Sequence, residues 1–177
     1  MTTNFRHECF WGALTRKISL ANELYEEQGS ALLAKPDIAQ QLEVMNKHAA
    51  SVSKSMQNTT IPEQCTICAT TGKNGGCCSL SMADENDTIL LLANLLAGNA
   101  VRAQRDDGRE CSFLGPAGCS LRFKPMFCLN YLCSHIRKRL TLDELRKLDR
   151  AAGLLLQSQY RAEQILLADL QTSGSIG

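Results

Sequence analysis

Apolar residues recur at three- and four-residue intervals along two stretches near the N-terminal end of the chain. The first stretch runs from Phe10 to Tyr25, with three glutamates largely off its apolar stripe, which is the pattern of an amphipathic helix. The second follows Lys35-Pro36-Asp37, a turn and helix start, and extends from Ile38 to Met56. Its alternating four- and three-residue steps are typical of packed helices, so we predict a helical hairpin over residues 1–58.

Two further helices are indicated by their capping residues. Asp84 is expected to cap a shorter helix that contains the apolar run from Ile89 and stops near Gly98. Thr141-Leu-Asp-Glu144 matches the capping box, in which threonine and glutamate satisfy each other's backbone donors. We therefore predict a C-terminal helix over residues 136–171 and a frayed tail over 172–177. Gly153 costs that helix about 1 kcal/mol relative to alanine and is a place where it could bend.

The region between these helices, residues 59–135, has little periodicity apart from the one inserted helix. Residues 70–76 and 114–118 are rich in glycine and read as loops with little apolar material to order them. Eight of the nine cysteines lie in this region. They are Cys65, Cys68, Cys77, Cys78, Cys111, Cys119, Cys128 and Cys133. We predict that their thiols hold the loops, which makes the fold mainly α, a single domain with a long-helix bundle flanking an irregular cysteine-rich metal-binding core.

The oxidation state expected for these thiols depends on the compartment. The first ten residues are polar and charged, without the apolar core of an export signal. The longest apolar run, Ile89 to Ala97, is far shorter than the about 20 residues that span a bilayer. We therefore expect a cytoplasmic protein without a membrane-spanning segment, whose thiols are kept reduced. Clustered cysteines there indicate metal ligands or redox groups.

The cysteine spacing suits tetrahedral thiolate chemistry. Cys65 and Cys68 form a C-x-x-C pair, which brings two sulfurs onto one metal, and Cys77 is directly followed by Cys78. Zinc and a 4Fe-4S cluster each take four thiolates, so eight cysteines fill two centres, or one centre plus a redox-active set. Neighbouring side chains in extended backbone point to opposite faces, so the adjacent pair is easier to place with one thiol in each of two centres. His135, two residues after Cys133, is a reserve candidate that could replace one thiolate in a zinc site with three cysteines and one histidine.

The order of these residues resembles the CxxCxxCC (YkgJ-like) family of zinc- or iron-chelating proteins. The family's Cys-x-Phe-Leu, its glycine-bearing loop, a further cysteine and its proline landmark correspond here to Cys111-Ser-Phe113-Leu114, residues 115–118, Cys119 and Pro125. The resemblance covers residues 65 to about 133, about two-fifths of the chain. Two departures are a longer gap between Cys68 and Cys77, and Lys124 and Leu129 at positions where arginine is common. The resemblance implies metal chelation; some relatives are named as iron–sulfur oxidoreductases, and flagellin lysine methylases contain a related cysteine module.

These observations lead to two functional hypotheses of different classes. The first is a metal-binding protein with structural or regulatory zinc, whose helical surface meets a protein partner. The alternative is an iron–sulfur redox or protein-modifying enzyme, or its accessory protein; thiol–disulfide chemistry is a third, weaker option. The usual motifs of nucleotide-binding and hydrolytic enzymes are missing, so the sequence leaves open whether the protein is an enzyme. A net charge of +1 gives no electrostatic reason to expect nucleic acid, and the amphipathic helices suit a homodimer as well as an intramolecular bundle.

Overall fold

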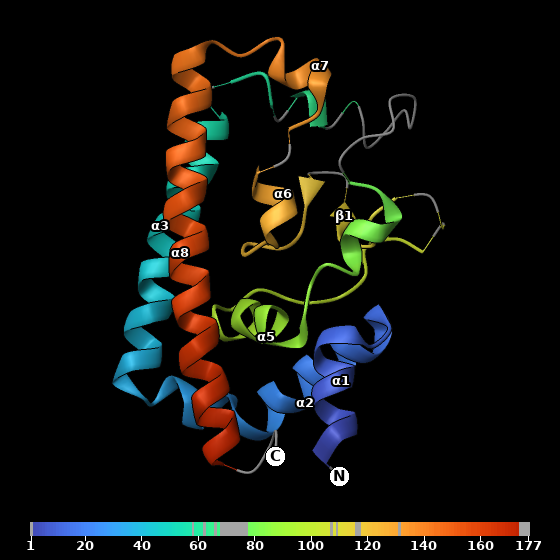
Figure 1. Cartoon of the computed structure of the whole chain (residues 1–177), viewed down its shortest axis with the longest axis vertical. Coiled ribbons are helices and arrows are strands. Elements are labelled where there is room, and N and C mark those ends of the chain that lie inside the picture. The colour runs from blue at the N-terminus through green and yellow to red at the C-terminus, as the bar shows by residue number, and fades with distance from the viewer. Residues whose placement is uncertain are drawn as a thin grey trace.

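A computed structural model describes residues 2–57, 59–61, 63–65, 67, 78–106, 108, 110–115, 118–130 and 132–173. The structure is mainly α-helical, as predicted (Figure 1). Two long helices, α3 (Pro36–Gln57) and α8 (Leu142–Thr172), run side by side along its length, and the shorter elements lie to one side of them. None of the described helices is both long and apolar enough to cross a bilayer.

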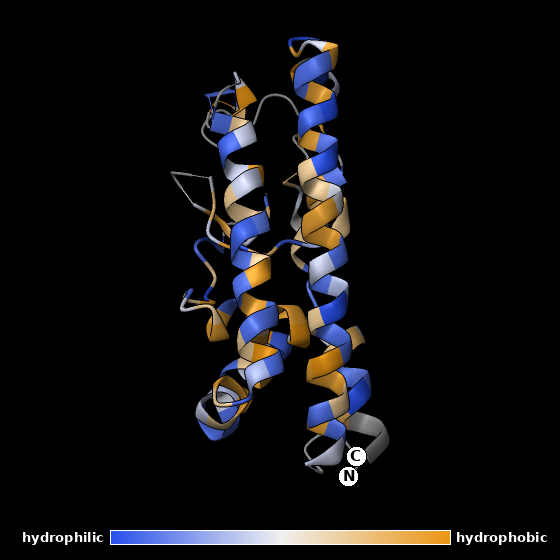
Figure 2. Ribbon diagram, turned by 90° about the vertical axis from the view of Figure 1, so that its left-hand side faces the viewer, coloured by the Kyte–Doolittle hydropathy of each residue, from blue (hydrophilic) through white to orange (hydrophobic). Residues whose placement is uncertain are grey.

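The most extensive contact between elements joins α3 and α8, which run antiparallel (Figures 1 and 2). Each helix buries one apolar stripe in the same hydrophobic cluster, the arrangement expected when amphipathic faces meet. Polar contacts also cross the interface: Gln41 Nε2 donates to the Ser158 carbonyl at 2.8 Å, and His48 Nδ1 lies 3.1 Å from Ser158 Oγ. The partner of α3 is therefore mainly a helix that lies some hundred residues further along the chain.

The other N-terminal helices pack elsewhere. Helix α1 (Thr2–Trp11) leads into α2 (Leu14–Leu33), and α2 packs mainly against α5 (Thr88–Leu96). Lys17 of α2 is 3% exposed, and its ammonium donates to the Asp84 carbonyl at 2.8 Å. This bond ties α2 to the turn that precedes α5.

Of the two predicted N-caps, the one of α8 is confirmed and the one of α5 was wrong. The N-cap of α5 is Asp87, whose carboxylate accepts from the Leu90 amide at 2.8 Å. Asp84, the predicted cap, instead follows the 3-10 helix η1 (Leu80–Ala83), so the prediction was wrong by three residues. The capping box of Thr141 and Glu144 at the start of α8 is confirmed. Helix α8 continues without interruption past Gly153.

The segment before α8 is built from short elements. Strands β1 (Leu114–Gly115) and β2 (Gly118–Cys119) pair antiparallel, so the predicted loop contains a small β-ladder. Gly118 has φ +98°, a conformation that favours glycine. Two short helices follow, α6 (Met126–Asn130) and α7 (Ser134–Arg137).

Candidate metal centre

Six of the eight predicted ligands belong to the described residues, and five of these fall into two groups. Cys78, Cys111 and Cys119 pack in one hydrophobic cluster with α5 and the β-ladder. Cys65 and Cys133 pack in the other cluster, which contains the α3–α8 interface. Cys128 lies in α6. Cys68 and Cys77 are predicted ligands that lie outside the described residues.

Backbone pairing brings the first group together. The Cys111 amide donates to the Cys78 carbonyl at 2.9 Å, and an antiparallel bridge joins the neighbouring residues Ser79 and Glu110. Leu114, which stands three residues after Cys111, is paired with Cys119 in the β-ladder. Backbone pairing therefore places the cysteines of two segments that are well separated in the sequence, one with Cys78 and one with Cys111 and Cys119, around one apolar cluster.

Cys128 of α6 interacts electrostatically with the thiols of the first group. Burial raises the pKa of Cys128 to about 12, and Cys119, Cys111 and Cys78 add to this increase in the pKa. Burial likewise raises the pKa of Cys111 to about 11, with a smaller contribution from Cys119 and Cys78. Cys111, Cys119 and Cys128 are free thiols, which excludes a disulfide for these three residues in this structure. We call Cys78, Cys111, Cys119 and Cys128 the four-thiol cluster.

Two buried amide side chains fix the chain between Cys119 and Cys128. Asn94 of α5 accepts the amides of Arg122 and Phe123 at 2.9 and 3.0 Å, and its Nδ2 donates to the Phe123 carbonyl at 3.0 Å. Gln159 of α8 donates to the Lys124 carbonyl at 2.9 Å. Asn94 is fully buried in an otherwise apolar run, and its polarity is explained by this role.

Lys124 is a described residue that influences the cluster and was not among the predicted ligands. Burial raises the pKa of the Cys119 thiol, whereas the Lys124 ammonium lowers it, and Lys124 also acts to lower the pKa of Cys128. A cation beside thiols favours their charged form, which is the form that binds metal. Its position in the sequence could have indicated this effect, because Lys124 stands where arginine is common in the family that the cysteine pattern resembles.

The chemistry of the donor set fits a thiolate-bound ion, but the distances do not close a site. Within the described part of the chain, no three His, Cys, Asp or Glu side chains approach closely enough to hold one metal ion. The side chain of His135, the reserve ligand, lies outside the described residues. Cys9, the one cysteine outside the predicted ligands, lies in α1 and is completely buried, so it is a core residue.

Comparisons of the chain with protein-family models, with curated proteins and with solved structures found no match.

Proposed function

We propose that this protein binds zinc through its cysteines, with a structural or regulatory role and a protein partner for its helical surface. The observation that carries the proposal is the four-thiol cluster. Cys78 and Cys119 act to raise the pKa of Cys111, and all three act to raise the pKa of Cys128. Four thiolates are the complete ligand set of a structural zinc site, and these four would have to move closer together to hold an ion, because no three of them form a metal site among the described residues.

Energetics support a structural role for the metal. The segments that carry the cluster have only short elements, namely η1, the β-ladder and α6. Structural zinc contributes about 10–16 kcal/mol of apparent binding free energy in small peptides, enough to fix such segments. Burial raises the pKa of Cys111, Cys119 and Cys128, so metal binding has to displace their protons, and the affinity rises with pH.

The grouping of the cysteines favours two centres. The four-thiol cluster supplies four ligands, and Cys65 and Cys133 lie against a different hydrophobic cluster. On this proposal Cys78 serves the first centre, while Cys77 serves a second centre with Cys65, Cys68 and Cys133. This assignment places the adjacent residues Cys77 and Cys78 in different centres, as expected for neighbouring side chains in extended backbone. Membership of the CxxCxxCC family is part of the same proposal.

An iron–sulfur redox or protein-modifying function is the second candidate, and a specific observation favours it. Cys128 of α6 directly follows Met126 and Phe127, whose side chains are 54% and 48% exposed. An electron-transfer cluster needs such an apolar edge near the protein surface, where a redox partner can approach. All four members of the cluster are cysteines, which suits iron–sulfur ligation as well as zinc.

Anaerobic purification, followed by elemental analysis and a visible spectrum, tests the proposal. A colourless protein with two equivalents of zinc per chain supports the first candidate. Broad visible absorbance with iron and sulfide supports the second and contradicts zinc. A purified chain with less than stoichiometric metal that takes up neither on reconstitution contradicts both.

Matched variants localise the site. Cys119→Ser should lose about half of the bound metal, because one of the two centres loses a ligand. Cys9→Ala removes a cysteine outside the predicted ligands and should leave the metal content unchanged. Equal metal content in the two variants would mean that the four-thiol cluster is not a ligand set.

A further inference from the structure

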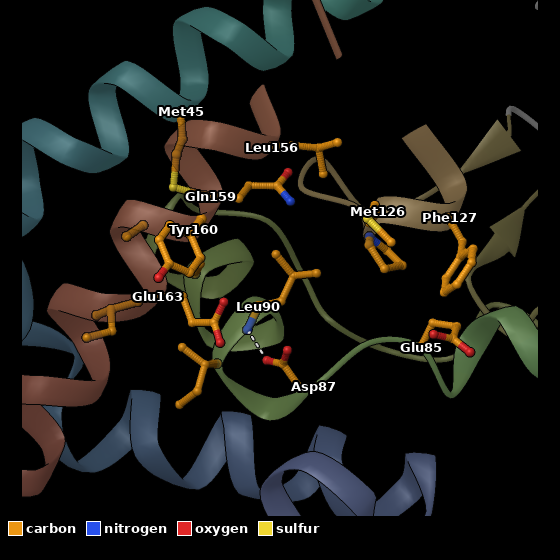
Figure 3. A pocket seen from close by; sticks show the side chains of 15 residues that line it. Met45, Glu85, Asp87, Leu90, Met126, Phe127, Leu156, Gln159, Tyr160 and Glu163 are labelled. Atoms are coloured by element: carbon orange, nitrogen blue, oxygen red, sulfur yellow. Dashed lines mark hydrogen bonds between the residues drawn. The ribbon is translucent and has the colours of Figure 1, made fainter. Parts of the chain in front are cut away.

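A cavity of about 390 Å³ opens between α5, α6 and α8. Figure 3 shows that its lining comes from elements far apart in the sequence, with Met45 of α3 at one side and Met126 and Phe127 of α6 at the other. Its lining residues are mainly apolar, and several of these side chains, such as Ile89 and Leu166, are almost completely buried. The volume falls in the range of sites for small molecules or single side chains.

The charged groups of this cavity all have the same sign. Glu85, Asp87 and Glu163 line it, and no basic residue belongs to its described lining. Burial raises the pKa of Glu163, and Asp87, which lines the same cavity, raises it further. Burial raises the pKa of Asp87 and Lys17 acts to lower it, but the Lys17 ammonium is already hydrogen-bonded to the Asp84 carbonyl. The cavity therefore has an excess of negative charge.

Among the residues that the structure describes, Glu163 has no partner for its charge. Within the described part of the chain its carboxylate makes neither a hydrogen bond nor an ion pair, although the side chain is half-buried. Asp87 is different, because its carboxylate also caps α5 through the Leu90 amide. A cation with N–H donors bound beside Glu163 would make charge-assisted hydrogen bonds to this carboxylate.

A second and independent observation is a buried acceptor without a donor. Gln159 is 8% exposed and lines the cavity, and its Oε1 has no hydrogen-bond partner among the described residues. Its Nε2 donates to the Lys124 carbonyl, which fixes the orientation of the amide. Figure 3 shows the Gln159 side chain pointing from α8 into the space between the helices. Such an acceptor requires an N–H or O–H donor from a ligand or from water.

The rim of the cavity is aromatic. Tyr160 of α8 is 63% exposed and Phe127 of α6 is 48% exposed, and both line the opening. Aromatic faces attract cations through the ring quadrupole, and they also cover the aliphatic part of a ligand. A ligand for this site therefore combines a positive charge, N–H donors and an aliphatic body.

We propose that this cavity binds an alkylammonium group, from either a lysine side chain of a protein partner or a free aliphatic diamine. The ammonium would lie between Glu163 and Asp87, with the Gln159 amide oxygen as a further acceptor, and its methylene chain would contact the apolar walls. This site does not depend on metal binding by the thiols. Helix α6 nevertheless connects the two, because Phe127 lines the cavity and Cys128 belongs to the four-thiol cluster.

Calorimetric titration of the full chain with three probes tests the proposal. The probes are Nα-acetyl-lysine-N-methylamide, its norleucine counterpart, which has the same aliphatic body without the charge, and 1,5-diaminopentane. We expect at least one of the two amines to bind with a dissociation constant at or below about 1 mM, and the norleucine compound to bind at least about tenfold more weakly. Tighter binding of the lysine compound indicates a protein lysine as the source, and tighter binding of the diamine indicates a free amine.

Two variants remove charge while keeping the fold. Glu163→Gln should weaken amine binding by about tenfold or more, because a charge-assisted hydrogen bond is lost. Asp87→Asn should weaken it as well, and asparagine caps a helix as well as aspartate does. Glu27→Gln changes an exposed carboxylate of α2 and serves as the control, with unchanged binding. Absence of binding by both amines, equal binding of the norleucine compound, or equal affinity in Glu163→Gln and Glu27→Gln would overturn the proposal.

Discussion

Asn94→Ala tests the link between the helical scaffold and the candidate site. Asn94 makes three hydrogen bonds to the backbone of Arg122 and Phe123, at 2.9, 3.0 and 3.0 Å. Alanine removes all of them. Phe123 is completely buried, so its amide and its carbonyl have no access to water after the substitution.

The expected loss of stability follows from those two groups. A buried donor or acceptor left without a partner costs about 1–3 kcal/mol. The amide and carbonyl of Phe123 together give about 2–6 kcal/mol, while the Arg122 amide belongs to an exposed residue and adds little. A domain is typically stable by about 5–15 kcal/mol, so the variant should lose a large fraction of its stability.

Urea unfolding of metal-free protein measures this effect. We expect a lower midpoint for Asn94→Ala with an unchanged m-value. Asn99→Ala is the matched control, because Asn99 makes one long bond of 3.4 Å and should cost less than about 1 kcal/mol. Asn94→Ala should also bind less metal than Asn99→Ala, because Asn94 fixes the chain between Cys119 and Cys128. If the two variants unfold at the same midpoint, Asn94 does not hold this segment.

Three further predictions concern the scaffold. Thr141→Ala removes the capping box of α8 and should cost about 1 kcal/mol in thermal or urea unfolding, whereas Thr172→Ala, in the exposed last turn, should stay within about 0.5 kcal/mol. Leu155→Ala at the α3–α8 interface should cost about 2–5 kcal/mol, and its exposed neighbour Leu154 less than about 0.5; equal costs would refute the observed burial. Burial raises the pKa of Cys9 from 9.0 to about 11, so the unfolded chain loses this proton at lower pH than the folded chain does. The melting temperature should therefore fall between about pH 9 and 11, and less steeply in Cys9→Ala; parallel curves would contradict this.

The helices were predictable because their signals are local. The apolar stripe from Ile38 and the capping box at Thr141 each depend on residues within a few turns, and the structure has α3 and α8 at these positions. The pairing of α3 with α8 was not predictable, because an amphipathic stripe does not specify which other stripe covers it. The cap of α5 was misplaced for a related reason: Asp84 and Asp87 both precede the apolar run, and only the turn after η1 distinguishes them.

The sequence singled out the cysteines, and metal binding by them stays a prediction, but their grouping in the fold could not be predicted. Cysteine count and spacing indicated ligands, but spacing alone does not show that Cys78 and Cys111 meet through a backbone hydrogen bond. The roles of Asn94 and Gln159 could not be predicted either, because each bonds to the backbone of a segment remote in sequence. The cavity between α5, α6 and α8 has no sequence motif, since each of these helices contributes only part of it.

X-ray absorption at the edge of the bound metal tests the central claim most directly, because it reports which atoms bind the ion. Ligation by the cysteines predicts a first shell of sulfur alone, at about 2.3 Å for zinc. A first shell of nitrogen or oxygen at about 2.0–2.1 Å, with no sulfur, would contradict the account.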